Sequence, residues 1–404
     1  MSIIIRRPEL ENFLRTNGRR LLYGRRKTGK TFTARQTLPK YNYYIVRKGG
    51  TIYNPEDDIE LDTSSFIRLC RVEEHIILDE FHRANPKLFD AIHAGTCTDQ
   101  LVLITSTLHY YKKHVTGKDA PLQGLFKQYK VDLISPKDLL SHKWKKLNKE
   151  TIELLVYYQE PILIGWTMHD IATSGPEMVK GLVGDILMEE DLTITNRYLG
   201  ILEAIAAGKT RLTEITNWLY SKGLIKKPET GMITKYLAIM TKIGLLEKIP
   251  ILRTKRSIYR HKSPLTYTLY YLEARYSISD TPLPPQFKTS VIKQIVPHLI
   301  ETFIEKLFTE TLGLRPVKIL QPETDIALTK FKQLKLIAEV KWTSDITRQK
   351  LRKTEEKLAK LPAETKLLIL PDKTILPRET WLQVLDITDL IKMAKGELTI
   401  SKNS

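Results

Sequence analysis

The stretch Leu21-Leu-Tyr-Gly24-Arg25-Arg26-Lys27-Thr28-Gly29-Lys30-Thr31 decides the fold. It fits G-x-x-x-x-G-K-[S/T] after a short apolar run, the pattern of a phosphate-binding loop between a strand and a helix. The glycines let backbone N–H groups wrap a phosphate, Lys30 reaches the β- and γ-phosphates, and the Thr31 hydroxyl ligates Mg²⁺. The sequence therefore predicts a site for ATP and Mg²⁺ whose loop residues are Gly24, Arg25, Arg26, Lys27, Thr28, Gly29, Lys30 and Thr31.

Two later strands end in polar groups that suit the same site. His75-Ile-Ile-Leu-Asp79-Glu80 is an apolar run that ends in two carboxylates. Asp79 would complete the Mg²⁺ shell, and Glu80 would polarise the attacking water. A run at 101–104 is followed by Thr105 and Ser106, which would sense the γ-phosphate. Alone, these residues could equally cap a strand or form a turn; beside a phosphate loop we favour the catalytic interpretation.

Length and composition exclude several classes of protein. The chain has 404 residues, enough for two to four domains of ~100–200 residues each. It is 42% hydrophobic and 27% charged, which excludes disordered and collagen-like proteins. Two cysteines are too few for a disulfide framework or a zinc ribbon, so we expect a reducing, cytoplasmic setting. No apolar run approaches ~20 residues and the N-terminus lacks the apolar core of a signal peptide, so no membrane is expected.

The charge balance points to a polyanionic partner. The formal net charge is +18, and residues 195–285 hold 15 Lys/Arg against 6 Asp/Glu, half of the whole excess. Excess of this kind is typical of proteins that bind nucleic acid. We expect DNA as the partner; a basic, solvated surface is the alternative, which the concentration in one segment disfavours.

The chain divides into three blocks. In residues 1–194, strand-like runs alternate with helical patterns, which indicates an α/β domain. The expected strands are Leu21–Tyr23, Tyr43–Val46, His75–Leu78, Leu101–Ile104 and Val131–Ile134. Residues 195–285 are mostly helical, and a proline-rich linker at 280–286 separates them from residues 286–404. There we expect helix, strand, strand, helix and strand in that order.

The middle block predicts a winged helix-turn-helix. Helical patterns at 197–207, 211–219 and 230–240 precede a basic strand pair. The third helix would enter the major groove with Thr234 and Lys235, and the hairpin cations Arg253, Lys255 and Arg256 would meet phosphates. The alternative is a module that contacts only protein, within the chain or in a partner.

The last block carries a second set of chemical groups. Asp325, Glu339 and Lys341 form Asp-x13-Glu-x-Lys over two strands, with Glu339 and Lys341 on one face. Two carboxylates can bind Mg²⁺, and a lysine can orient water or stabilise phosphorane charge. The pattern resembles the PD-(D/E)xK nuclease core. A preceding helix offers Glu305 as an accessory metal ligand, with Glu301 one turn earlier. A solvated strand pair and an inactive nuclease relative remain alternatives.

Residues 1–280 resemble the archaeal ATPase family within the AAA-related, STAND-type P-loop NTPases. The matches are Arg6-x-x-Glu9-Leu10, the phosphate loop, Leu78-Asp79-Glu80-Phe81, Thr105-Ser106-Thr107 and Pro121-Leu122-Gln123-Gly124. Leu125 stands where the family has an arginine, for which Arg83, Arg25 and Arg26 are candidate substitutes. The resemblance implies an AAA-like parallel sheet with a helical lid in residues 1–194. It also implies a nuclease-like C-terminal domain with Glu-x-Lys-Trp on one strand.

These features together predict a Mg²⁺-dependent ATPase coupled to DNA binding and to metal-dependent DNA cleavage. The resemblance alone implies a role in genome defence or mobile-element DNA processing. One rival is a nucleotide-switched DNA-binding regulator with an inactive nuclease fold. Another is a protein-remodelling signalling ATPase, whose winged helix contacts only protein. A nucleotide-dependent homo-oligomer is left open.

Overall fold

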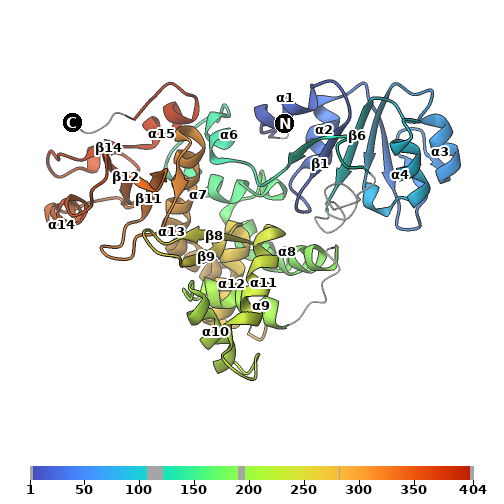
Figure 1. The fold of residues 1–404 in the computed structure, drawn as a ribbon. Coiled ribbons are helices and arrows are strands. Elements are labelled where there is room, and N and C mark those ends of the chain that lie inside the picture. The colour runs from blue at the N-terminus through green and yellow to red at the C-terminus, as the bar shows by residue number, and fades with distance from the viewer. Residues whose placement is uncertain (1–2, 107–121, 190–195, 282, 401–404) are drawn as a thin grey trace.

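The computed structural model describes residues 3–106, 122–189, 196–281 and 283–400. Figure 1 shows three parts: a blue sheet with its helices, a green and yellow helical part, and an orange-red sheet with its helices. The green helices α6 (Pro136–Ser141) and α7 (Lys149–Tyr158) lie between the two sheets.

The first sheet has seven strands in the order β4-β3-β2-β5-β6-β1-β7. From β2 to β7 neighbouring strands are parallel, whereas β3 and β4 form an antiparallel edge. The strands are β1 (Arg20–Tyr23), β2 (Asn42–Val46), β3 (Ile52–Asn54), β4 (Ile59–Leu61), β5 (His75–Asp79), β6 (Gln100–Thr105) and β7 (Lys127–Lys130). The helices are α1 (Pro8–Leu14), α2 (Lys30–Thr37), α3 (Thr63–Leu69), α4 (Pro86–His93) and the 3₁₀ turn η1 (Phe81–Arg83).

The expected strand Val131–Ile134 is wrong, because the last strand of this sheet comes earlier, as β7. Its side chains are largely exposed, as an edge strand permits, so its sequence carries little apolar signal. The apolar residues Val131, Leu133 and Ile134 are buried without being in a strand. The other four expected strands are confirmed by β1, β2, β5 and β6.

A helical part follows the first sheet. It contains the three helices and the strand pair in the order that the sequence predicts. It contains α6, α7, η3 (Pro161–Leu163), α8 (Met168–Glu189), α9 (Asn196–Ala206), α10 (Leu212–Ser221), α11 (Thr230–Lys242), β8 (Leu246–Pro250), β9 (Ser257–His261) and α12 (Pro264–Tyr276). Three helices (α9 to α11) thus precede an antiparallel pair, β8 and β9. We call residues 251–256 between these strands the hairpin tip.

The C-terminal part is a mixed five-stranded sheet in the order β10-β11-β12-β13-β14. The expected helix, strand, strand, helix and strand correspond to α13, β11, β12, α14 and β13, but the two-residue strand β10 comes before β11, and η4, β14 and α15 follow β13. The elements are α13 (Pro285–Leu312), β10 (Arg315–Pro316), β11 (Ile326–Lys330), β12 (Gln333–Val340), α14 (Arg348–Ala359), β13 (Thr365–Ile369), η4 (Lys373–Ile375), β14 (Gln383–Leu385) and α15 (Ile387–Ala394).

One apolar core runs across the expected block boundaries. A single cluster of buried side chains includes residues from α7, α8, α9, α12, α13 and the strands β11 to β13. The long helix α13 packs against α6, α7, α8 and β11, so it is shared by the helical part and the C-terminal sheet. Burial of this continuous apolar surface holds the parts together. Within the described ranges, no helix is long and apolar enough to cross a membrane.

Candidate nucleotide site and carboxylate–lysine site

The phosphate loop has the backbone geometry that its glycines predict. Gly24 has φ +144, and a Cβ there would lie 2.2 Å from the Val131 carbonyl oxygen. Gly29 has φ +83 and caps α2, which begins at Lys30. Larger residues would therefore clash or strain the backbone, and the loop turns directly into the positive end of a helix.

Lys30 lies across this loop. Its Nζ donates to the carbonyl oxygens of Gly24 at 2.9 Å and Arg25 at 2.8 Å. The Thr28 hydroxyl also donates to the Arg25 carbonyl, at 2.9 Å. The ammonium is thus held beside the backbone groups that a phosphate would contact.

Asp79 ends β5 directly opposite Thr31. The Thr31 hydroxyl donates to Asp79 Oδ2 at 2.5 Å, and the Tyr43 hydroxyl donates to the same oxygen at 3.1 Å. Tyr43 comes from β2, the strand beside β5. Burial, followed by the charge of Asp79, raises the pKa of Tyr43, so its hydroxyl stays a donor. Hydroxyl and carboxylate oxygens are the hard ligands that Mg²⁺ takes, so Thr31 and Asp79 fit this ion.

Glu80 belongs to a polar chain at the same edge of the sheet. Its Oε2 lies 3.4 Å from His82 Nε2 and 3.3 Å from Arg83 Nη2. His82 Nδ1 lies 3.3 Å from the Thr105 hydroxyl at the end of β6. Burial, together with nearby positive charges, lowers the pKa of His82 to about 4, so the ring is neutral at pH 7. The sequence-predicted Glu80 and Thr105 are therefore joined through His82, which sequence reasoning missed.

A cavity of about 710 Å³ opens over these residues. Its polar wall includes Lys30, Thr31, Asp79, Glu80 and Ser106. Arg7, Arg26, Lys27, Thr28 and Thr33 also line the cavity. Its apolar wall comes from residues far apart in sequence: Ile3, Ile4, Ile5, Ile134, Pro161, Ile162 and Ile164. A pocket of this size with one polar end suits a ligand that has a charged tail and a flat apolar ring.

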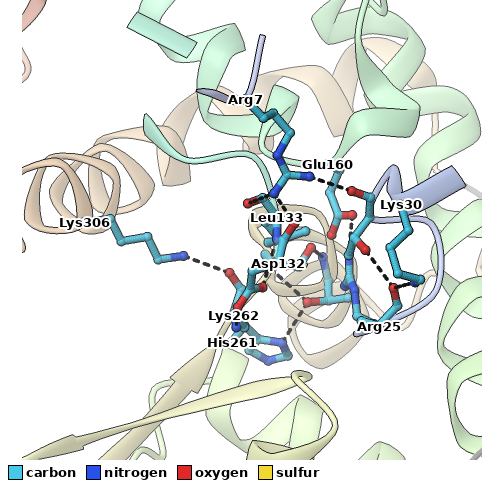
Figure 2. A network of polar contacts seen from close by, with 12 residues as sticks. Arg7, Arg25, Lys30, Asp132, Leu133, Glu160, His261, Lys262 and Lys306 are labelled. Carbon is cyan, nitrogen blue, oxygen red and sulfur yellow. Dashed lines mark hydrogen bonds and ion pairs between the residues drawn. The ribbon is translucent and has the colours of Figure 1, made fainter. Parts of the chain in front are cut away.

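Two arginines, Arg7 and Arg25, attach the phosphate loop to neighbouring segments (Figure 2). Arg7 donates to the carbonyl oxygens of Thr28 and Asp132, each at 2.8 Å. Arg25 pairs with Glu160, and both side chains are buried. Glu160 lies two residues after α7, so the loop is tied to the helical part. The sequence gives no signal for either contact beyond the arginines themselves.

Three arginines are candidate substitutes for the arginine expected at position 125, and each of them contacts a carboxylate. Arg25 is held by Glu160, Arg26 Nε lies 3.6 Å from Asp185 Oδ2 on α8, and Arg83 contacts Glu80. Of the three, Arg26 alone lines the cavity. Thr107 and Pro121, which carried part of the resemblance, lie outside the described residues.

The second predicted set of residues meets at one end of β11 and β12. Asp325 immediately precedes β11, Glu339 lies in β12, and Lys341 immediately follows it. Lys341 Nζ lies 2.8 Å from Glu339 Oε2 and 3.8 Å from Asp325 Oδ2. The Val340 N–H donates to Asp325 Oδ2 at 2.8 Å. The fold thus brings together the three residues that the sequence spacing selected.

Burial and neighbouring carboxylates perturb this site. Burial raises the pKa of Asp325 to about 6, helped by Glu339 and Glu301. Burial alone would lower the pKa of Lys341, but the carboxylates of Glu339 and Asp325 outweigh it and raise that pKa. A second lysine, Lys357 of α14, pairs with Glu339 Oε1. Sequence reasoning placed a helix here but missed Lys357, because helical spacing does not tell which side chain reaches a strand.

The prediction of Glu305 as an accessory metal ligand is corrected by the structure. Glu305 does not join the carboxylates of Asp325 and Glu339; its Oε1 pairs with Arg260 Nη2 of β9 at 2.6 Å. Glu301, one helical turn earlier, is the α13 carboxylate that raises the pKa of Asp325. The reason is that α13 serves two neighbours, and successive turns of one face contact different elements. Within the described part of the chain, no three His, Cys, Asp or Glu residues are grouped to hold a metal ion.

The residues predicted to contact DNA are exposed. Lys235 lies on the outer face of α11, and Arg253, Lys255 and Arg256 lie on the hairpin tip. None of the carboxylates that the structure describes lies within ion-pair distance of these four cations. Their charge is therefore available to an external anion.

Comparisons with known proteins give distant likenesses. No protein-family model matches the chain. An uncharacterized protein of Methanocaldococcus jannaschii, MJECL04, is 24% identical over 291 residues, which are 64% of this chain and 61% of that protein. The chain thus spans about three-fifths of the length of this curated relative.

Three similar solved structures are also distant, each under 20% identical to this chain and with a TM-score below 0.5. The Walker-type ATPase PABY2304 of Pyrococcus abyssi is 18% identical, with a TM-score of 0.48 over 66% of this chain and 96% of that one. The ORC2 protein of Aeropyrum pernix in its ADP form is 16% identical, with a TM-score of 0.32 over 73% and 94%. The ORC1 protein of the same organism, solved in complex with DNA, is 13% identical, with a TM-score of 0.32 over 70% and 96%.

Proposed function

We propose that this protein is a Mg²⁺-dependent ATPase that binds DNA and cleaves it at the carboxylate–lysine site. The observation that supports the ATPase is the convergence of Lys30, Thr31, Asp79 and Glu80 on one cavity with a polar and an apolar wall. Two of these residues come from the phosphate loop and two from the end of β5.

Each of these residues has a defined role in ATP hydrolysis. Lys30 exchanges the loop carbonyls for the β- and γ-phosphates of ATP. Thr31 and Asp79 hold Mg²⁺, which would neutralise phosphate charge. Glu80 orients the attacking water and accepts its proton. The apolar wall around Ile5 and Ile162 packs against the base.

The ATPase proposal is tested with two variants and a control. Lys30→Ala should abolish ATP binding, and Glu80→Gln should bind ATP but hydrolyse it at least ~100-fold more slowly, because a general base contributes ~100-fold or more. Lys87→Ala removes an exposed cation from α4 and should change neither property. ATP turnover undiminished in Lys30→Ala would contradict the site.

The DNA-binding proposal is supported by the basic block 195–285 and its three helices and hairpin, which we interpret as a winged helix. Lys235 on α11 would face the major groove, and the hairpin cations would contact phosphates. DNA affinity should therefore fall steeply with salt. A DNA affinity that does not change with salt concentration would favour the alternative in which the winged helix contacts only protein.

The cleavage proposal rests on Asp325, Glu339 and Lys341. Asp325 and Glu339 supply the oxygen ligands for a divalent cation, and Lys341 lies where it can hold a water or a phosphate oxygen. The test incubates single-stranded, duplex and branched DNA with Mg²⁺ or Mn²⁺, with and without ATP. Cutting should vanish in Asp325→Ala; cutting that persists there would place the nuclease activity elsewhere.

A specific observation favours a second candidate function, a nucleotide-switched DNA-binding regulator. Both carboxylate oxygens of Glu339 are held by lysines, Lys341 and Lys357. Two ammonium groups around one carboxylate disfavour a cation at the same oxygens. The regulator would bind DNA according to nucleotide state and leave every DNA substrate intact with either metal ion.

A further inference from the structure

The hairpin tip is hydrogen-bonded to the chain that leads into Asp325. The Leu252 N–H donates to the Lys318 carbonyl at 2.9 Å, and the Lys318 N–H donates to the Pro250 carbonyl at 2.8 Å. Ile251 and Lys318 pair in a parallel bridge. The side chain of Leu252 packs against the apolar cluster under the C-terminal sheet. The tip is therefore attached to this sheet by backbone and side chain.

Lys318 in turn lies beside the start of β11. The Val317 N–H donates to the Ala327 carbonyl at 2.9 Å, and Leu320 bridges Glu323 in a tight reversal of the chain. The Lys318 ammonium pairs with Glu323 at 2.7 Å. The lateral order is hence hairpin tip, residue 318, β11 and β12. With about 4.8 Å between neighbouring strands, the tip backbone lies about 10 Å from the backbone at Asp325.

The tip presents its cations on a fixed turn. Arg253 has φ +59, a left-handed conformation that is unfavourable for a non-glycine residue and persists where the surrounding structure fixes it. The Thr254 hydroxyl donates to the Ile251 carbonyl at 3.1 Å and accepts from the Arg256 N–H at 3.0 Å. The side chains of Arg253, Lys255 and Arg256 are exposed. Three cations are thus held in one place while their charge faces outward.

We infer that the hairpin tip is part of the Asp325 site and holds the phosphate backbone of a nucleic-acid strand one or two nucleotides from the bond at Asp325, Glu339 and Lys341. This inference rests on the proposed function. A small anion cannot contact a tip and a site about 10 Å apart, whereas a strand with regularly spaced phosphates can. Arg253, Lys255 and Arg256 are positioning residues here, because they lie outside the reacting groups.

The first experiment measures binding, so it does not depend on cleavage. The affinity of the full chain for an end-labelled duplex is measured at pH 8 in EDTA over a range of salt concentrations. The tip variant is Arg253→Ala/Lys255→Ala/Arg256→Ala, and the control variant is Lys40→Ala/Lys48→Ala/Lys87→Ala. The control removes three exposed cations from the first part of the chain, so both variants lose the same net charge.

The tip variant should lower the slope of log affinity against log salt by about 2–3, because each lost phosphate contact contributes about 0.9. The control should leave that slope unchanged. Asp325→Asn removes a negative charge beside the bound strand and should strengthen binding several-fold. An unchanged slope in the tip variant, or an unchanged affinity in Asp325→Asn, would overturn the inference, whether or not the protein cuts DNA.

The second experiment applies where the wild type cleaves. The tip variant should raise KM for DNA and also lower kcat, because a strand held loosely reaches Lys341 less often. The swap Arg253→Lys/Lys255→Arg/Arg256→Lys keeps the charge and should restore both parameters. A tip variant that changes KM alone would make the tip a remote anchor and overturn its position beside Asp325. A wild type that never cuts refutes the cleavage proposal and leaves the binding test of the tip intact.

Discussion

The indole N–H of Trp342 donates to Glu153 Oε1 at 3.1 Å. Trp342 directly follows Lys341 of the carboxylate–lysine site, whereas Glu153 lies on α7. Seven residues after Glu153, Glu160 pairs with Arg25 of the phosphate loop. The end of α7 from Glu153 to Tyr158, about 8 Å long at about 1.5 Å per residue, and the two residues after it join the neighbours of both sites. The two sites therefore share a structural support.

Replacing Trp342 should destabilise the protein through this contact. Trp342→Phe keeps an aromatic ring but removes the N–H, and it leaves the Glu153 carboxyl, whose pKa burial already raises, without this donor. We expect a loss of about 1–2 kcal/mol in urea unfolding. Trp381→Phe, at a tryptophan that is 51% exposed, is the control and should lose less than about 0.5 kcal/mol. Equal losses would show that the hydrogen bond contributes nothing.

Breaking the ion pair between Arg25 and Glu160 should lower the free energy of unfolding by more than the Trp342 substitution does. Glu160→Ala leaves the buried guanidinium of Arg25 without its carboxylate, and we expect a loss of about 3–5 kcal/mol in unfolding free energy. The double variant Arg25→Met/Glu160→Leu removes both charges and should recover most of this loss. The measurement is urea unfolding of both variants. A double variant as unstable as Glu160→Ala would mean that packing, and not the unpaired charge, sets the cost.

The Tyr43 hydroxyl should affect how well Asp79, the proposed Mg²⁺ ligand, supports ATP hydrolysis. Tyr43→Phe removes the hydroxyl that donates to Asp79 Oδ2, while the buried ring is kept. A hydrogen bond to a charged group contributes about 1.5–3 kcal/mol, so we expect kcat for ATP to fall by about 10–150-fold. Tyr53→Phe removes a hydroxyl that donates to Asp58 on the far edge of the sheet and serves as the control. A kcat equal to that of Tyr53→Phe would show that the Tyr43 hydroxyl is not needed.

The partly buried His82 should make the free energy of unfolding fall as the pH is lowered. Its folded pKa is lowered to about 4, whereas an unfolded histidine titrates near about 6.5. As the pH falls through this window the unfolded state takes up the proton first, so stability is present above about 6.5 and is lost toward about 4. Between pH 7.5 and 5 we expect a loss of about 2 kcal/mol that His82→Gln lacks.

The control for this pH dependence is His169→Gln, at an exposed histidine of α8, which should keep the wild-type loss. Urea unfolding at the two pH values measures all three proteins. A His82→Gln variant with the full wild-type pH dependence would place the responsible group elsewhere in the chain.

The sequence by itself determined the chemistry-bearing residues, because these follow local rules. The glycine positions of the phosphate loop, the acids at the end of β5 and the Glu339/Lys341 alternation all depend on spacing within one or two elements. Spacing on a strand fixes which side chains share a face, so the contact of Lys341 with Glu339 could be predicted. The position of the edge strand β7 could not be predicted from the sequence, because its side chains are largely exposed and carry little apolar pattern.

Only the tertiary structure decided the partners of these residues. Glu305 faces Arg260 and not Asp325, Lys357 reaches Glu339 from α14, and Arg7 holds the phosphate loop. Each of these contacts joins residues that lie 18 or more positions apart. The hairpin tip likewise reaches Lys318 across more than 60 residues. Such contacts depend on how the buried apolar faces of helices and sheets pack together, and helical or strand periodicity carries no information about that packing.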